Sequence, residues 1–175
     1  MFAPHVGDTD AIYQAGPKLG FIYVFRTNYI DLYKLGFTES SLAGRHKNLS
    51  NRLGVTHIEA AVMTIDAREQ EAAMFEFAWQ HADRIKTNLN RKRFKACELF
   101  VLDEAGIGAV RAHLLNHIAH YPYVGSPDSS PHRLAAIRKA TEYNRSAAGV
   151  EMTVQGVDRV LKKLSRDCHT SDQRL

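Results

Sequence analysis

The sequence predicts an α+β fold: a small, mainly antiparallel sheet of three or four strands, flanked by helices and followed by a C-terminal helical extension. Two runs rich in aromatic and β-branched residues, 21–25 and 31–38, flank a short polar break and predict a β-hairpin. Apolar residues in 41–53, 66–85 and 103–120 recur at helical spacing. With 45% hydrophobic residues, a chain of 175 residues can form one sizeable core plus an appendage.

The register of the hairpin decides which polar side chains meet. If the chain reverses at Asn28 and Tyr29, Tyr23 pairs directly with Lys34. Directly paired residues share one face of a sheet. We therefore expect a phenol and an amine side by side.

Capping signals mark the elements after the hairpin. Ser41 is a suitable N-cap for a helix that ends near Gly54. A third strand is expected at 57–65, and Asp66 with Glu69 forms a capping-box pattern at the start of the next helix. That helix is expected to carry its apolar face as far as residue 85.

The last part of the main domain is predicted as a basic linker at 87–95, a final strand at 97–102 and a helix at 103–120. One face of this helix carries three histidines at metal-ligand spacing, His113, His117 and His120. Without a specified Cys or carboxylate partner, exposed histidines explain this pattern more simply than zinc does.

Stretches rich in Pro, Gly and Ser mark the boundaries of four segments in the chain. They are an N-terminal arm (1–19), the main domain (20–120), a linker (121–131) and a basic helical extension (132–175). Two helices expected in the extension form either a helix-turn-helix-like pair or a pair packed on the main domain, and we favour packing.

The positive charge of the chain is unevenly distributed. The net charge of +4 arises within 131–175, which holds 9 Lys or Arg against 5 Asp or Glu, while 1–130 holds 14 of each. A second basic cluster comprises Arg84, Lys86, Arg91, Lys92, Arg93 and Lys95. Clustered cations favour a polyanion such as nucleic acid, although a solvated charged face has the same composition.

Several classes of protein are disfavoured by the sequence. No stretch is apolar enough to span a membrane, and the first 18 residues lack the apolar centre of a signal peptide. We therefore expect a cytoplasmic protein, of the cell or of a host cell, that is not secreted. Cys97 and Cys168 lie far apart without zinc-ligand spacing and are expected to be free thiols.

Two charged residues occupy positions where helical periodicity asks for apolar ones. Arg45 falls on the apolar stripe of its helix, and Glu71 falls on that of the helix beginning near Asp66. A structural ion pair between them would explain both positions without any function. A shared polar site would explain them as well.

These residues also carry a family resemblance. Its parts are Phe21-Ile22-Tyr23, then Lys34-Leu35-Gly36 with Lys34 eleven residues after Tyr23, then Arg45 eleven further on, and Glu71. This pattern resembles the GIY-YIG nuclease superfamily. Over 20–103 the chain is similar to the small phage- and virus-associated branch that is often described as a DNA-binding domain. Phe21 replaces the usual first glycine, and Lys34 replaces the usual second tyrosine.

The resemblance implies a metal-dependent endonuclease that hydrolyses phosphodiester bonds of DNA in phage, mobile-element or restriction biology. Glu71 would hold Mg²⁺ or Mn²⁺, and Arg45 would contact the scissile phosphate. Tyr23 or Lys34 would activate the attacking water. A phenol with a pKa near ~10 is a poor base unless a cation lowers that value, whereas Lys34 becomes a base if burial lowers its own pKa.

Several roles stay open at this point. Other members of the superfamily place an asparagine near the last strand, and the candidates for that role are Asn88, Asn90 and Glu98. Tyr33 and His46 are further candidates for supporting roles. The alternative function is a catalytically inactive nucleic-acid-binding module on the same fold. Nothing separates RNA from DNA as the substrate, and a double-strand break would need a homodimer or sequential cuts.

Overall fold

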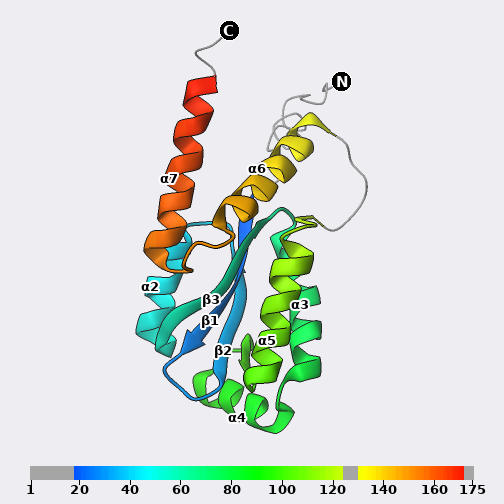
Figure 1. Cartoon of the computed structure of the whole chain (residues 1–175). Coiled ribbons are helices and arrows are strands. Elements are labelled where there is room, and N and C mark those ends of the chain that lie inside the picture. Colours follow the sequence, from blue (N-terminus) through cyan, green and yellow to red (C-terminus); the bar gives the residue numbers. More distant parts are fainter. Residues whose placement is uncertain (1–17, 124–129, 172–175) are drawn as a thin grey trace, which may run out of the picture.

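The computed structural model describes residues 18–123 and 130–171 and confirms the α+β class. All strand pairs of its four-stranded sheet are antiparallel. The strands lie in the order β3-β1-β2-β4, and their bounds are β1 Gly20–Thr27, β2 Leu32–Thr38, β3 Val55–Thr64 and β4 Leu99–Val101. Helices cover both faces of the sheet (Figure 1).

The described helices form two groups. On one face lie α2 (Leu42–Leu53), α6 (Pro131–Ala147) and α7 (Val154–Ser171). On the other lie α3 (Ala67–His81), α5 (Glu104–His113) and the π-helical turn η1 (Leu114–Ile118), while α4 (Arg84–Phe94) packs beside β4. Figure 1 shows α2 and α7 on one side of the sheet, opposite α3 and α5.

Strand β1 separates two hydrophobic cores. Because side chains alternate along a strand, Tyr23 and Phe25 enter the core shared with α2, α6 and α7. Ile22 and Val24 enter the core shared with α3 and α5. A central strand buried on both faces accounts for the unbroken apolar run that predicted it.

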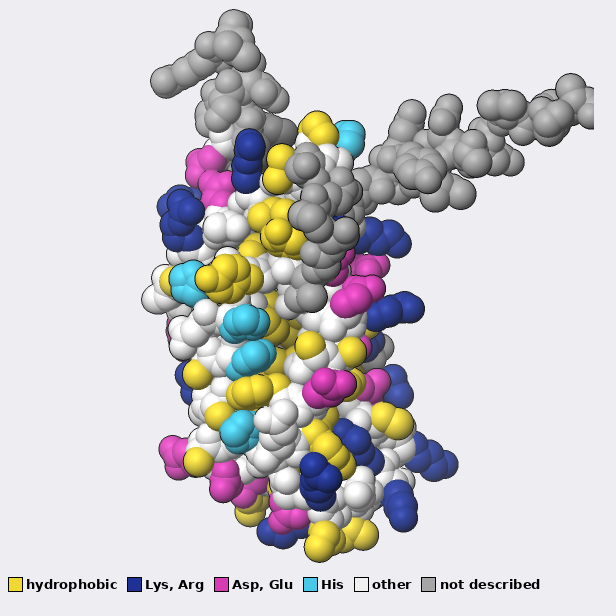
Figure 2. All heavy atoms as spheres, turned by 90° about the vertical axis from the view of Figure 1, so that its right-hand side faces the viewer, with side chains coloured by type: hydrophobic (Ala, Val, Ile, Leu, Met, Phe, Trp, Pro, Cys, Tyr) yellow, Lys and Arg dark blue, Asp and Glu magenta, His cyan; other side chains and the backbone are white. Residues whose placement is uncertain are grey.

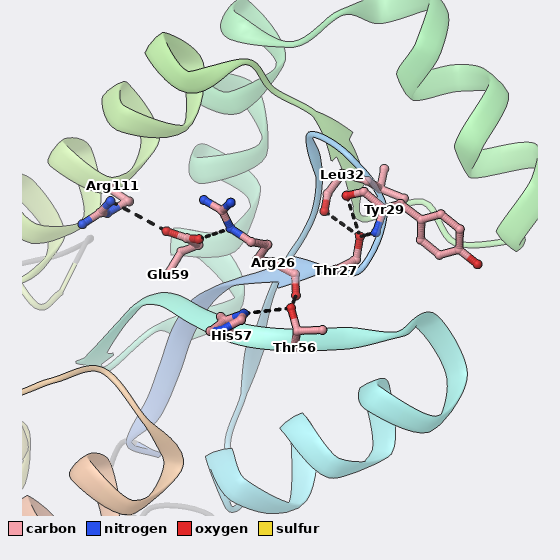
Figure 3. Close-up of polar contacts among 8 residues, drawn as sticks. All are labelled: Arg26, Thr27, Tyr29, Leu32, Thr56, His57, Glu59 and Arg111. Atoms are coloured by element: carbon pink, nitrogen blue, oxygen red, sulfur yellow. Dashed lines mark hydrogen bonds and ion pairs between the residues drawn. The ribbon is translucent and has the colours of Figure 1, made fainter.

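The predicted hairpin is present, but its predicted register is wrong. Tyr23 pairs with Gly36, and Lys34 pairs with Phe25. The loop is longer because Thr27 organises it: its hydroxyl accepts from the Tyr29 N–H at 3.2 Å and donates to the Leu32 carbonyl at 2.8 Å (Figure 3). The error is two residues, an even number, so Tyr23 and Lys34 still share one face as diagonal neighbours.

Helix α2 begins and ends where its caps predicted, but the start of α3 differs from the prediction. Ser41 accepts from the Gly44 N–H, and Gly54 closes α2 in the left-handed conformation. Asp66 precedes α3 with φ 55° and caps nothing. Its carboxylate binds Arg133 of α6 at 2.6 Å instead, so a long-range ion pair replaces the predicted capping box.

The segment expected to be a linker is helix α4. Helix α3 ends at His81, and Asp83 then caps α4 by accepting from the Lys86 N–H at 3.0 Å. Ile85, expected on the buried face of the preceding helix, is consequently exposed. The strand at the end of this region is also shorter than predicted, Leu99–Val101 rather than 97–102.

The C-terminal helices pack on the main domain, as expected. Tyr143 of α6 is buried edge-on against Phe21, with ring centroids 5.2 Å apart. Asn144 caps the outer edge of β3: its side chain accepts from the Met63 N–H at 2.8 Å and donates to the Met63 carbonyl at 2.9 Å. Phe21, which stands where the GIY-YIG pattern has its first glycine, is thus covered by the C-terminal extension.

Some predicted segments lie wholly or partly outside the described residues. These are most of the N-terminal arm (1–17) and of the linker (124–129), together with the last four residues. Helix α7 runs to Ser171. Cys97 is an exposed free thiol. None of the helices within the described ranges combines the length and the apolar character that crossing a membrane requires.

Candidate active site

A buried phenol held by an arginine lies at the centre of the candidate site. Tyr23 of β1 is 0% exposed, and its ring stacks on Phe25 with centroids 4.1 Å apart. Arg45, in the first turns of α2, donates from Nε to the Tyr23 hydroxyl at 3.0 Å. Among described residues, no other hydrogen bond of the Arg45 guanidinium is found, so its terminal nitrogens can meet a ligand.

Beside this phenol lies a buried amine. Lys34 is 3% exposed, and its Nζ lies 5.8 Å from the centroid of the Tyr23 ring. The Nζ donates to the Leu35 carbonyl at 2.7 Å and lies 3.6 Å from the Glu98 carboxylate. Burial lowers the pKa of Lys34 to about 8, because desolvation of the ammonium outweighs the attraction of Glu98.

Gly36 makes this close approach possible. A Cβ at Gly36 would lie 2.7 Å from the Tyr23 hydroxyl oxygen and 3.1 Å from Lys34 Nζ. The two polar atoms therefore both lie within about 3 Å of one point above the strand. Only a residue without a side chain leaves room for them there.

Glu71 approaches the site from α3, at the open edge of β2. Strand β4 pairs only with Leu32, Tyr33 and Lys34, and the next N–H of β2, that of Leu35, donates to the Glu98 carbonyl at 3.0 Å. Beyond Leu35, this edge of β2 has no partner strand within the described residues. Burial raises the pKa of the half-buried Glu71, while the Lys34 charge and the nearby Phe37 N–H act in the opposite direction.

The charge of Glu71 also acts on the other site residues. Burial raises the pKa of Tyr23, the hydrogen bond from Arg45 partly offsets this, and the Glu71 charge adds to the rise. Across the described residues, no ion pair joins Arg45 to Glu71. The structural ion pair considered from the sequence is therefore absent, although the charges of Arg45 and Glu71 act on each other.

A cleft of about 260 Å³ opens beside Lys34 and Arg45. Its charged lining residues are Lys34, Arg45, Arg52, Lys95 and Glu98. Four cations against one carboxylate suit an anionic ligand such as a phosphate. Sequence reasoning missed Arg52, although its position seven residues after Arg45 on the same helix face was a usable signal.

Of the candidates for supporting roles, one lines the cleft and the others lie elsewhere. Glu98 lines the cleft. Tyr33 points to the opposite face of the sheet, where the Arg26 guanidinium lies 5.5 Å from its ring. His46 packs edge-on against Phe25 and lines another cavity, of about 500 Å³. Asn88 is exposed on α4, and Asn90 donates to the Lys86 carbonyl of its own helix.

The basic cluster of α4 is only partly available to a ligand. Arg91 turns inward, where its Nε donates to the Leu99 carbonyl at 2.8 Å and its guanidinium packs on Trp79 and Phe100. Arg84 lies over Trp79, and Arg93 lies over Tyr29 and Phe94. The exposed lysines of the cluster are Lys86, Lys92 and Lys95.

Two of the three helical histidines, His113 and His117, belong to a ring stack. His113 stacks on Phe77 at 4.2 Å and on His117 at 5.0 Å, and Figure 2 shows histidines gathered along one face. The described ranges contain no group of three or more His, Cys, Asp or Glu side chains arranged to hold a metal ion. Aromatic packing therefore accounts for the position of His113.

Comparisons with protein-family models, with curated proteins and with solved structures find no match for this chain. The resemblance to GIY-YIG nucleases thus rests on the residues of the site alone.

Replacing Gly36 by alanine tests the close approach over β2. We expect Gly36→Ala to lower the free energy of unfolding by about 1–3 kcal/mol, because the new methyl group displaces Tyr23 or Lys34. Gly44→Ala is the matched control: it lies on α2 with its nearest atoms at 3.7 Å, and should add about 0.5–1 kcal/mol. Chemical denaturation measures both, and equal stabilities of the two variants would contradict the packing described.

The lowered pKa of Lys34 predicts a pH-dependent stability. Between the folded pKa of about 8 and the ordinary value of 10.5, the unfolded chain keeps the Lys34 proton and the folded chain has released it, so wild-type stability rises with pH. Relative to Lys34→Met, the wild type should gain at most about 3 kcal/mol across this window in denaturation experiments. Lys92→Met, an exposed control, should parallel the wild type. A Lys34→Met curve parallel to both would exclude the shift.

Proposed function

We propose that this chain is a metal-dependent endonuclease that hydrolyses phosphodiester bonds of DNA. The observation that carries the proposal is the convergence over Gly36: the Tyr23 hydroxyl and the Lys34 amine lie within about 3 Å of one point. Arg45 holds the phenol, and Glu71 lies beside them at the open edge of β2. Four separate elements contribute these four side chains, which are the types that phosphodiester hydrolysis requires.

Arg45 supplies the positive charge for the phosphate. Its Nε donates to the Tyr23 hydroxyl, which leaves the terminal nitrogens for a ligand, and Arg45 lines the cleft. A planar guanidinium suits phosphate oxygens and is worth more where water is partly excluded. Arg52 and Lys95, which line the same cleft, would contact neighbouring phosphates of the strand.

The chemistry of Glu71 fits a Mg²⁺ or Mn²⁺ ion. Burial raises the pKa of this carboxylate, so a cation beside it would relieve the cost of its charge. Mg²⁺ retains several waters and commonly uses one or two carboxylates plus substrate phosphate, so a larger acidic cluster is not needed. When bound, such an ion polarises the phosphoryl oxygen and makes water more acidic.

Lys34 is better suited than Tyr23 to take the proton from the attacking water. Its pKa of about 8 leaves a usable fraction of neutral amine near neutral pH, whereas burial raises the pKa of the Tyr23 phenol. Tyr23 would then orient the water or the phosphate through its hydroxyl. A lysine in place of the motif's second tyrosine is consistent with this division of roles.

One observation favours the alternative, a binding module without catalysis. The Tyr23 phenol is fully buried, and even a Cβ on Gly36 would lie 2.7 Å from its hydroxyl oxygen, so a phosphate would reach the phenol only if these side chains moved. On this alternative, Arg45, Arg52 and Lys95 bind the backbone and nothing is cut.

Cleavage assays with a matched pair of glutamate variants separate the two functions. With Mg²⁺, wild-type protein should nick supercoiled plasmid, and EDTA should abolish nicking. Glu71→Gln should lose at least about 10²-fold in rate. Glu69→Gln, exposed on the same helix, should cut like the wild type, and both variants should melt near it.

Two outcomes would contradict the nuclease proposal. The first is normal cutting by Glu71→Gln. The second is no cutting by any form together with equal, salt-sensitive DNA binding, which would establish the binding module.

A further inference from the structure

Helix α4 presents its apolar residues to the outside. Ile85 is 77% exposed and Leu89 is 61% exposed, whereas the buried residue of the helix is Thr87. A helix on a protein surface ordinarily shows the opposite arrangement, with its apolar stripe inward. Adjacent exposed large apolar side chains often mark an interaction site.

The inner face of α4 is polar and is fixed by the last strand. The Thr87 hydroxyl accepts from the Val101 N–H at 2.9 Å. One turn later, Arg91 donates to the Leu99 carbonyl at 2.8 Å and lies between Trp79 and Phe100. Burying Ile85 and Leu89 by rotating the helix would break these bonds, so the outward stripe is built into the fold.

The outward stripe joins side chains of three chemical types. Asn88, Leu89 and Lys92 lie three, four and seven residues after Ile85, so the four side chains form one strip along the helix. In the major groove, amides bond adenine, amines bond guanine, and apolar side chains contact the thymine methyl group. At ~1.5 Å per residue the helix is about 16 Å long, and a major groove admits such a helix.

Charge selects DNA over a second copy of this chain as the occupant. Helix α4 contains five Lys or Arg and no Asp or Glu, so two copies facing each other through α4 would set cations against cations. A polyanion has the complementary charge. Figure 2 shows hydrophobic side chains interspersed with Lys and Arg, and with some Asp and Glu, at the lower end of the molecule, where Figure 1 places α4.

The strip also continues into the candidate active site. Helix α4 ends at Phe94, and the next residue, Lys95, lines the cleft that contains Lys34 and Arg45. A duplex with one phosphate at Arg45 would therefore run along α4. The length of the helix corresponds to roughly five base pairs at ~3.4 Å each.

We propose that α4 enters the major groove of duplex DNA and reads its base sequence, with Asn88 and Leu89 as specificity-determining residues. That the ligand is DNA rests on the proposed function, but sequence reading by α4 does not require the chain to cut DNA. It predicts that base preference and cutting are separable properties of the chain.

Selection of bound duplexes from a randomised pool, with EDTA present so that nothing is cut, tests this proposal. Wild-type protein should enrich particular bases at two or three neighbouring positions, each by roughly 5- to 150-fold, the range that ~1–3 kcal/mol of discrimination gives. The double variant Asn88→Ala/Leu89→Ala should lose this enrichment while its salt-dependent binding to the unselected pool stays within about threefold.

The matched control changes the same residue types elsewhere: Leu115→Ala/Asn116→Ala, both exposed on η1, should keep the wild-type preference. Enrichment retained by the α4 variant would overturn the proposal. No enrichment by the wild type would overturn it as well, and would leave acidic protein segments as the class of partner for the outward stripe. The selection does not require cleavage, so the two proposals can fail separately. A chain that selects sequences in EDTA but cuts no plasmid with Mg²⁺ would refute the nuclease and keep the role of α4. A chain that cuts plasmid with Mg²⁺ but shows no base preference would refute the role of α4 and keep the nuclease.

Discussion

The candidate site depends on how short β4 is. This strand pairs with only the first three residues of β2, and after one further bond, from the Leu35 N–H to the Glu98 carbonyl, the edge of β2 is open. The Phe37 N–H on that open edge interacts with the Glu71 carboxylate. A longer β4 would take the Phe37 N–H into the ladder and close the approach to the buried amine and phenol. The position of Glu71 in the site thus depends on a backbone group that the sheet leaves unpaired.

The buried amine explains why the surrounding groups are arranged as they are. An ammonium that is 3% exposed is costly, so Lys34 lies against a carbonyl, a carboxylate and the face of an aromatic ring. These contacts do not fully compensate for burial, as the lowered pKa shows. With a lowered pKa, a fraction of the amine is neutral near neutral pH, and the neutral amine is the form that can accept a proton.

Much of the site was predictable from sequence because its signals are local. Tyr23 and Lys34 met despite the wrong register, since an even error preserves the face of a strand. Arg45 and Glu71 stood out as charges on apolar stripes. The identity of α4 was not predictable in this way, because its inner face is satisfied by β4 rather than by apolar burial. The Asp66–Arg133 pair likewise spans elements that no local pattern connects.

The C-terminal helices belong to the packing of the sheet. Tyr143 covers Phe21, and Asn144 occupies the edge of β3 at Met63. Removing them would expose apolar surface and an unpaired strand edge. Loss of DNA binding after such a truncation would therefore report unfolding as readily as a lost contact, and point variants on α4 and around Gly36 are the cleaner probes.

We propose that a divalent cation and a phosphate bind this chain at the open edge of β2. The most direct measurement is a titration of ¹⁵N-labelled protein with Mn²⁺, which broadens the signals of nearby backbone amides. The account predicts the strongest broadening at Phe37 and Glu71, with the amides of His113 and His117 unaffected and the effect lost in Glu71→Gln. Broadening centred on the histidines, or none at Phe37 and Glu71, would contradict it.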